Sequence, residues 1–327
     1  MKKLIEIALG LMVIAGAVLP AHAQSPAKPI TLMIPFTAGG ATDVIGRTLA
    51  QSLSETLKQT VIAENVPGAG GTIAGRRLLE SPPDGSTLYM ASPSQLVLAG
   101  LVNRELKMKA EDFRPIHMIG TLPYVIMARS DLPVRTADEL AVLAREAARK
   151  GMPLTYASVG AGTLNHLLGE ELARRIKAPL VHVPYKGGAE VMRDLIGARV
   201  DIFINIYTAQ QIALAQEGRF KFLAALSAAR QPLLPQVQTV DEGNVLKGWH
   251  TEVWSGLFVR TDTPEPVVQN LNKAMARVLS DEKVRKFLLD QAGLRAATPR
   301  TSTADVDKEY AAGVEEFRTL GRNAGFN

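Results

Sequence analysis

The feature that most constrains the fold of this chain is a repeated unit of a short apolar run, a glycine-containing turn and a helical pattern. In the first copy the run 30–34 ends at Pro35 and the turn 38–40, and a helix should begin near Thr42 or Asp43. Further apolar runs of strand length begin at Val61, Thr87, Tyr124, Leu154, Val181, Asp201 and Phe222. Strands that alternate with helices predict an α/β fold with mostly parallel sheets covered on both faces.

The carboxyl-terminal part of the chain follows a different pattern. After an apolar run at 254–259, Pro264 opens one helix, Ser280 caps a second, and Ser302 with Asp305 resembles a capping box for a third. Helices without strands of their own must pack on an existing sheet. We therefore predict a discontinuous domain I (24–122 and 256–327), a domain II inserted between its parts (123–255), and two extended crossovers as the hinge.

The amino terminus has the pattern of an export signal. Lys2 and Lys3 precede an apolar run at 7–19, and Ala21-His22-Ala23 fits a small-x-small cleavage site. A membrane anchor is disfavoured because a span needs ~20 apolar residues. The sequence thus predicts a signal peptide at 1–23, cleavage after Ala23, and a periplasmic protein long enough for two domains of ~150 residues.

Charge and cysteine content exclude several classes of protein. The formal net charge is +5, and basic residues are interleaved with acidic ones, as in Arg145-Glu146, which is typical of solvated helix faces and not of a nucleic-acid surface. The chain has no cysteine, so disulfides, thiolate nucleophiles and cysteine-ligated metals are excluded.

The glycine-rich turns are the best candidates for ligand contact. In open parallel sheets, ligands bind beyond the carboxyl ends of the strands, where helix N-termini offer free N–H groups to an anion. Turns 37–42 and 158–163 could thus grip a carboxylate from two sides. No Gly-Lys-Ser or Gly-Lys-Thr follows these turns and no dinucleotide fingerprint is complete, so nucleotide binding is disfavoured.

Catalytic and metal sites are weakly supported. Ser92, Ser94 and Ser158 lack a Gly-x-Ser-x-Gly elbow, and His166 has Glu170 four residues on but no second histidine for zinc. For six further residues, a structural role stands beside a functional one: His117, His182, His250, Lys186, Trp249 and Trp254. The main hypothesis is a binding protein without catalytic residues, metal or cofactor. The alternatives are an exported hydrolase or lyase, and a regulator that presents its ligand to a sensor kinase.

An ordered set of motifs carries a resemblance to a known family. The set comprises Pro35-Phe36-Thr37-Ala38-Gly39-Gly40 with Asp43 and Arg47, Glu64-Asn65-Val66-Pro67-Gly68-Ala69-Gly70-Gly71, Pro83-Asp84-Gly85, Gly160-Ala161-Gly162-Thr163 with His166, Val183-Pro184-Tyr185-Lys186-Gly187-Gly188, and Gly256-Leu257-Phe258. It resembles the Bug-type substrate-binding proteins of tripartite tricarboxylate transporters, in order, over nearly all of the chain after the export signal.

The resemblance implies a two-lobed periplasmic binding protein of type II that holds a carboxylate between its lobes, partly through bridging waters. It also implies delivery to an ion-coupled membrane permease with two integral subunits. A monomer is expected, with no nucleic-acid partner. The candidate ligand-binding residues are Phe36, Thr37, Ala38, Gly39, Gly40, Asp43, Gly70, Ser92, Ser158, Gly160, Gly162, Thr163, His166, Tyr185 and Asn205.

Three places depart from the family's common pattern, at Asn205-Ile206, Thr208-Ala209 and Gln95-Leu96, and the first bears on the ligand. Relatives often carry Asp-Asn where this chain has Asn205-Ile206. An acidic group there could receive a ligand's amine, and Asn205 cannot supply that charge. We therefore expect a plain carboxylate, with one, two or three carboxyl groups, and not an amino acid.

Overall fold

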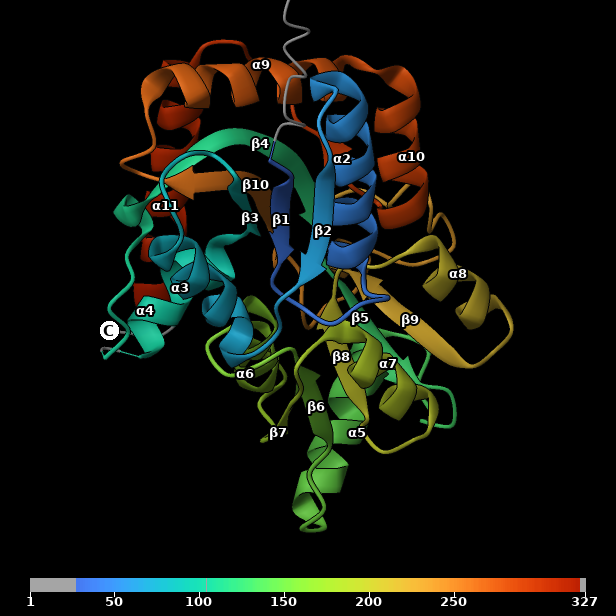
Figure 1. The fold of residues 1–327 in the computed structure, drawn as a ribbon. Helices are drawn as coiled ribbons and strands as arrows, with labels where there is room; N and C mark the ends of the chain where they lie inside the picture. Colours follow the sequence, from blue (N-terminus) through green and yellow to red (C-terminus); the bar gives the residue numbers. More distant parts are fainter. Residues whose placement is uncertain (1–27, 104, 324–327) are drawn as a thin grey trace, which may run out of the picture.

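The computed structural model describes residues 28–103 and 105–323 as two β-sheets that lie one above the other, each flanked by helices (Figure 1). The predicted signal peptide and its cleavage site lie outside the described residues. Within the described ranges, no helix is both long enough and apolar enough to span a bilayer.

The upper sheet has six strands in the order β11-β4-β10-β3-β1-β2. Its strands are β1 (Ile30–Ile34), β2 (Val61–Asn65), β3 (Thr87–Ala91), β4 (Phe113–Pro123), β10 (Glu252–Arg260) and β11 (Arg295–Ala296). The α-helices of this lobe are α2 (Ala41–Leu57), α3 (Thr72–Glu80), α4 (Ala99–Val102), α9 (Glu265–Ser280), α10 (Glu282–Ala292) and α11 (Thr303–Asn323). Short 3-10 turns η1 (Ala69–Gly71) and η3 (Ala110–Asp112) and a π-helical turn η2 (Ser94–Leu98) complete it.

The lower sheet has five strands in the order β7-β6-β8-β5-β9. Its strands are β5 (Val125–Arg129), β6 (Thr155–Ser158), β7 (Val181–Pro184), β8 (Ile202–Asn205) and β9 (Phe220–Ala225). Its helices are α5 (Ala137–Arg149), α6 (Leu164–Ile176), α7 (Gly188–Ile196) and α8 (Ala209–Gln216), followed by the 3-10 turn η4 (Val240–Glu242).

Both sheets are mixed, which corrects the prediction of mostly parallel sheets. In the upper sheet β3, β1 and β2 run parallel, while β10 is antiparallel to both of its neighbours. In the lower sheet β7, β6 and β8 run parallel, while β5 is antiparallel to β8 and β9. The crossovers explain the difference. β5 and β10 enter their sheets from the interface between the lobes, where the parallel strands end, so they must run against those strands.

Two chain passages connect the lobes and are hydrogen-bonded to each other. The Tyr124 N–H, between β4 and β5, donates to the Thr251 carbonyl at 3.4 Å. Leu226 bridges the same two residues: its N–H donates to the Tyr124 carbonyl at 2.9 Å, and its carbonyl accepts from the Thr251 N–H at 2.8 Å. Sheet pairing of the second passage begins at Glu252, which pairs with Pro123. The division of the chain into domain I (24–122 and 256–327) and domain II (123–255) stays a prediction.

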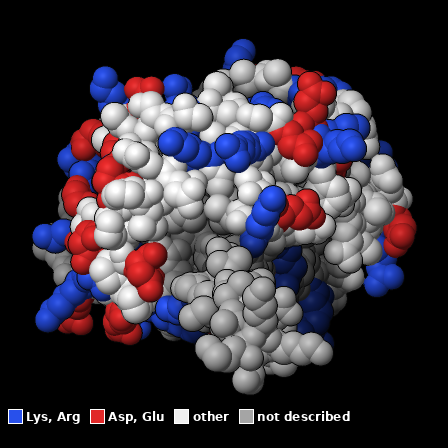
Figure 2. All heavy atoms as spheres, turned by 45° about the horizontal axis from the view of Figure 1, so that its top comes forward, with Lys and Arg blue, Asp and Glu red and all other residues white. Residues whose placement is uncertain are grey.

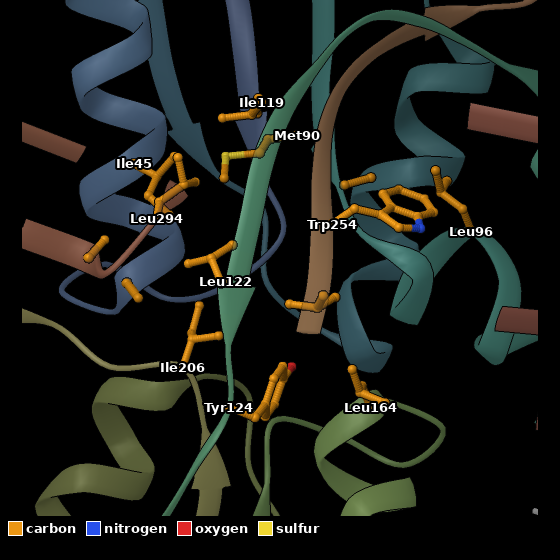
Figure 3. Packing of buried hydrophobic residues seen from close by; sticks show 14 of the residues in the cluster. Ile45, Met90, Leu96, Ile119, Leu122, Tyr124, Leu164, Ile206, Trp254 and Leu294 are labelled. Carbon is orange, nitrogen blue, oxygen red and sulfur yellow. The ribbon is translucent and has the colours of Figure 1, made fainter. Parts of the chain in front are cut away.

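The lower sheet buries both faces, as its alternating side chains require. Ile126 and Ile204 point to the face covered by α6 and join a core that extends into the upper lobe. Val125 and Phe203 point to the opposite face, which α7 covers, and form a separate core. In Figure 3, side chains of both lobes meet in the shared core around the β4–β5 crossover.

The carboxyl-terminal helices pack on the upper lobe, with α9 and α11 against β4 and α10 against α2 (Figure 1). Asp281, and not Ser280, is the N-cap of α10: its carboxylate accepts from the Lys283 N–H at 2.8 Å. The Ser280 hydroxyl donates to the Ala276 carbonyl at 2.7 Å inside α9, so the prediction of a Ser280 cap is wrong.

On the face seen in Figure 2, the acidic and basic side chains of the described residues lie interspersed, with no large region of one sign among them. This mixture of charges is typical of solvent-exposed helices and does not indicate a nucleic-acid-binding surface on this face.

Candidate ligand-binding site

The turn between β1 and α2 is fixed by the Asp43 carboxylate. This carboxylate accepts hydrogen bonds from the Gly39 N–H at 2.9 Å, Arg47 Nε at 3.1 Å and Asn65 Nδ2 at 2.9 Å. Burial opposes ionisation of Asp43, but these donors, Arg47 first, lower its pKa below the ordinary value. Asp43 is thus an anion whose carboxylate is hydrogen-bonded to three donors, and these bonds hold the turn between β1 and α2.

The start of α2 leaves hydrogen-bond donors free at the interface between the lobes. Gly40 is the N-cap and has no side chain to cap the helix. The first N–H groups of a helix have no partner inside it, and here they belong to Ala41 and Thr42, which line a cavity. Thr37 lines the same cavity, and its Oγ1 is buried with no hydrogen-bond partner among the described residues.

The start of α7 approaches the same place from the lower lobe. Its N-cap, Gly187, also offers no side-chain cap, and Gly188 lines the cavity. A Cβ on Gly187 would lie 2.0 Å from Thr37 Oγ1 and 2.9 Å from the Thr37 backbone nitrogen. Only a residue without a side chain allows the two turns to come this close.

An asparagine pair adds one more donor. Asn165 Nδ2 donates to the Ile204 carbonyl at 2.7 Å and to Asn205 Oδ1 at 2.8 Å. The carbonyl can only accept, so it fixes the orientation of the Asn165 amide, which in turn fixes that of Asn205. Asn205 Nδ2 is therefore directed away from Asn165. It lies 3.6 Å from the position of a Cβ on Gly188, and both residues line the cavity.

These groups surround a cavity of about 60 Å³ between the two lobes. Its wall is otherwise largely apolar, and none of the described residues that line it has a charged side chain. The lining residues are Pro35, Phe36, Thr37, Gly40, Ala41, Thr42, Ile45, Met90, Ala91, Ser92, Ser94, Gln95, Leu122, Tyr124, Val159, Asn165, Gly188, Asn205, Ile206, Val253, Trp254 and Ser255.

The glycine turn before α6 contacts the upper lobe beside the cavity. A Cβ on Gly160 would lie 3.0 Å from the Gly70 backbone, so these two turns pack tightly. The Leu164 N–H donates to Ser94 Oγ at 3.0 Å across the interface. The turn therefore joins the lobes, and its first helical N–H is already paired with a hydroxyl.

His166 and His182 stack with ring centroids 4.2 Å apart, behind this turn. His166 Nδ1 accepts from the Gly162 N–H at 3.2 Å, and His182 Nε2 lies 2.6 Å from the fully buried Ser158 Oγ. Burial lowers the pKa of both rings, that of His182 to about 4 with a further contribution from the neighbouring His166. Ser158 does not line the cavity.

The structure brings five of the predicted residues together in the cavity wall: Phe36, Thr37, Gly40, Ser92 and Asn205. The others lie around it or elsewhere. Tyr185 donates its hydroxyl to Asp194 at 3.1 Å, and Ala38 and Gly39 are exposed. The predicted residues outside the wall are Ala38, Gly39, Asp43, Gly70, Ser158, Gly160, Gly162, Thr163, His166 and Tyr185.

Sequence reasoning missed several wall residues, Asn165, Gly188, Leu122 and Tyr124 among them. Of these, only Gly188 carried a usable signal, because it belongs to a Gly-Gly turn between an apolar run and a helical pattern.

Residues 45–303 of this chain match the sequence model of a protein family that is described as the tripartite tricarboxylate transporter family receptor. Protein BugT of Bordetella pertussis is 30% identical over 315 residues, which cover 95% of this chain and 94% of BugT. A protein encoded in the TAR-I ttuE-ttuC' intergenic region of Agrobacterium vitis is 30% identical over 318 residues, which cover 96% of this chain and 90% of that protein.

Solved structures agree. The periplasmic binding protein BugD is 31% identical with a TM-score of 0.83, covering 93% of this chain and 99% of BugD. MatC from Rhodopseudomonas palustris, solved with bound malate, is 27% identical with a TM-score of 0.80, covering 90% and 99%. A second R. palustris protein, solved with adipate, is 29% identical with a TM-score of 0.82, covering 92% and 98%. The two-lobed fold, the interlobe cavity and these matches together show that the chain belongs to the solute-binding receptors of the tripartite tricarboxylate transporter family.

Proposed function

We propose that this receptor captures a small carboxylate in the cavity between its lobes and delivers it to an ion-coupled membrane permease with two integral subunits. The direct contacts proposed are Thr37, Asn205 and the first N–H groups of α2 and α7. Asp43 holds the turn that leads into α2, and His166 holds the glycine turn before α6, which borders the cavity.

The observation that carries the proposal is the hydroxyl of Thr37, for which the described part of the chain supplies no hydrogen-bond partner. A buried hydroxyl without a partner is costly, and this one lies in a cavity wall beside two uncapped helix N-termini. A carboxylate oxygen would satisfy the hydroxyl and the helix N–H groups together. The ligands of the solved relatives, malate and adipate, support a carboxylate here.

Ligand entry requires the lobes to separate. Leu122 and Trp254 of the cavity wall are buried, and the turns at Gly160 and Gly187 contact the opposite lobe. We place the hinge where the two passages between the lobes are hydrogen-bonded, at Tyr124 and Thr251. The units that move would then be the predicted domains I and II.

The cellular setting of the receptor belongs to the same proposal. Export by the signal at 1–23, with cleavage after Ala23, would bring the receptor to the periplasm, where it would act as a monomer. Family membership supports the periplasm and a permease partner.

Thr37→Val tests the proposal, because valine keeps the shape of threonine and removes the hydroxyl. A hydrogen bond to a charged group contributes about 1.5–3 kcal/mol, so affinity for the cognate carboxylate should fall by roughly tenfold or more. The free energy of unfolding without ligand should not fall, because the hydroxyl has no partner to lose within residues 28–103 and 105–323. Calorimetric titration and urea unfolding measure the two effects.

Thr48→Val is the matched control, since its hydroxyl donates to the Val44 carbonyl inside α2 and Thr48 does not line the cavity. It should leave affinity unchanged. If Thr37→Val binds carboxylates as tightly as the wild type, Thr37 does not contact the ligand and the proposed site is wrong.

A further inference from the structure

We infer that His166 and His182 form a proton-sensitive pair that positions the glycine turn before α6 (160–163) and ties ligand affinity to pH, an inference that rests on the proposed function. With both rings neutral, the turn has the shape that joins the lobes. A proton on His166 would release the turn and weaken closure on the ligand. Neither ring belongs to the described residues that line the cavity, so the pair would act on the ligand through the turn.

The glycine turn and the first residue of α6 contact the upper lobe beside the cavity. A Cβ on Gly160 would lie 3.0 Å from the Gly70 backbone, and one on Gly162 would lie 3.3 Å from the Cβ of Val102 in α4. The N–H at the start of α6 donates to Ser94 Oγ at 3.0 Å, and Ser94 lines the cavity. Because the two lobes approach this closely, a change in the shape of the turn would break these contacts.

The shape of the turn depends on an unprotonated nitrogen of His166. Nδ1 accepts from the Gly162 N–H at 3.2 Å, and an N–H group only donates, so Nδ1 carries no proton while this bond exists. The neutral ring then has its proton on Nε2, which lies 4.0 Å from the Glu170 carboxylate. In the imidazolium form both nitrogens are donors, so an Nδ1–H would meet the Gly162 N–H and the hydrogen bond would be lost.

The second ring makes a cation on His166 less favourable. His182 stacks on His166 with ring centroids 4.2 Å apart, and Tyr156 stacks on His182 at 5.0 Å. Burial lowers the pKa of both histidines, and for His182 the neighbouring His166 adds to this effect. In the arrangement that joins the lobes, both rings are therefore neutral near pH 7.

Glu170 is a charged group beside the pair, and it opposes the effect of burial on the pKa of His166. Its carboxylate also accepts a hydrogen bond from the Tyr156 hydroxyl. Its side chain is 54% exposed, so water weakens its attraction for a proton on the ring. The upper-lobe residues that face the turn, at positions 70, 94 and 102, are glycine, serine and valine and do not titrate.

The sign of the pH effect follows from which state of the receptor takes up the proton. With the lobes joined, burial holds the pKa of His166 below its ordinary value of 6.5, and release of the turn would return it toward that value. The open receptor then binds more protons than the closed one, so affinity falls as pH falls. For one ring that is neutral in the closed state and ordinary in the open state, the loss between pH 7.5 and pH 5.5 is about tenfold.

His166→Asn tests the coupling, because asparagine can offer its Oδ1 to the Gly162 N–H and cannot be protonated. The probe is whichever of malate, adipate, succinate, butanoate and benzoate binds the wild type most tightly. Calorimetric titration at pH 7.5 and pH 5.5 gives the loss of affinity for each protein. Protonation of the probe changes every protein's affinity by the same factor and cancels in the comparison. The loss should be about tenfold larger in the wild type than in His166→Asn.

His250→Asn is the matched control. His250 is exposed, its Nε2 lies 2.9 Å from an Asp241 carboxylate oxygen, and it does not line the cavity. This variant should lose affinity with falling pH as steeply as the wild type.

The outcomes separate the two proposals. If His166→Asn loses affinity as steeply as the wild type, this inference is overturned while carboxylate capture stands. If no probe binds the wild type, the proposed function fails and the coupling fails with it. An NMR titration of the ligand-free wild type needs neither a ligand nor a variant: the chemical shift of the Gly162 amide should follow the ionisation of His166. A Gly162 amide that does not respond would contradict the positioning role.

Discussion

Gly187→Ala should impair closure of the two lobes on a ligand and leave the folding of the lower lobe unchanged. Gly187 has φ −176° and ψ 166°, an extended conformation that alanine adopts without strain. The added Cβ would lie 2.0 Å from Thr37 Oγ1, 2.9 Å from the Thr37 backbone nitrogen and 3.1 Å from the Thr37 Cβ. The obstacle includes backbone held by the Gly39–Asp43 hydrogen bond, so a change of rotamer does not remove it.

Overpacking of this kind costs about 1–3 kcal/mol, which corresponds to a roughly 5- to 150-fold loss of affinity. The loss should appear in calorimetric titration, and small-angle scattering should show a smaller ligand-induced compaction than in the wild type. Gly100→Ala is the control, because its Cβ would meet only the Met108 carbonyl, at 3.9 Å. Wild-type affinity and compaction in Gly187→Ala would show that the contact between Gly187 and Thr37 is absent from the ligand-bound state, which would refute the closure mechanism.

Two further substitutions test the groups that hold the turns. Asp43→Ala removes the acceptor of the Gly39 N–H and should lower the free energy of unfolding by about 1–3 kcal/mol, measured with urea, whereas unchanged stability would contradict the anchoring role. Burial, with a contribution from His166, lowers the pKa of His182 from 6.5 to about 4, so between these values the unfolded chain binds more protons and stability falls as pH falls. His182→Gln should therefore lose less stability than the wild type between pH 7 and pH 4.5, and an equal loss would show that His182 does not contribute.

The sequence predicted the strands and helices whose pattern is local. The run 30–34, the turn after it and the helix that follows appear as β1, the turn 36–40 and α2. The turn's role as a cavity wall also follows from its position at the end of a parallel strand. Phe36, Thr37 and Gly40 were accordingly identified from sequence.

Strand β4 could not be predicted in this way. It is the longest strand of the upper sheet, but it contains Pro115, His117 and Gly120 and is buried on both faces, so it shows no alternation of polar and apolar residues. Its conformation depends on pairing with β10 and β11, which are far away in sequence. The mixed direction of the sheets was missed for the same reason.

The choice among glycine turns also needed the tertiary structure. The turn at 158–163 was predicted to contact the ligand, whereas the turn at Gly187-Gly188, which has a similar pattern, was not. Gly160 packs against Gly70 of the upper lobe, so the turn at 158–163 joins the two lobes beside the cavity. The turn at Gly187-Gly188 lies at the cavity itself, which Gly188 lines. Asn165 carried no sequence signal, because its role depends on the Ile204 carbonyl that orients its amide.

The measurement that most directly tests carboxylate capture is a thermal-shift screen of refolded, ligand-stripped protein without residues 1–23. The panel should contain mono-, di- and tricarboxylates, amino acids, sugars and nucleotides. A ligand at a hundred times its dissociation constant adds about 2.7 kcal/mol to the free energy of unfolding, which is a readily measured shift. We expect shifts from carboxylates. Shifts from a sugar or a nucleotide, with none from any carboxylate, would contradict carboxylate capture by this receptor.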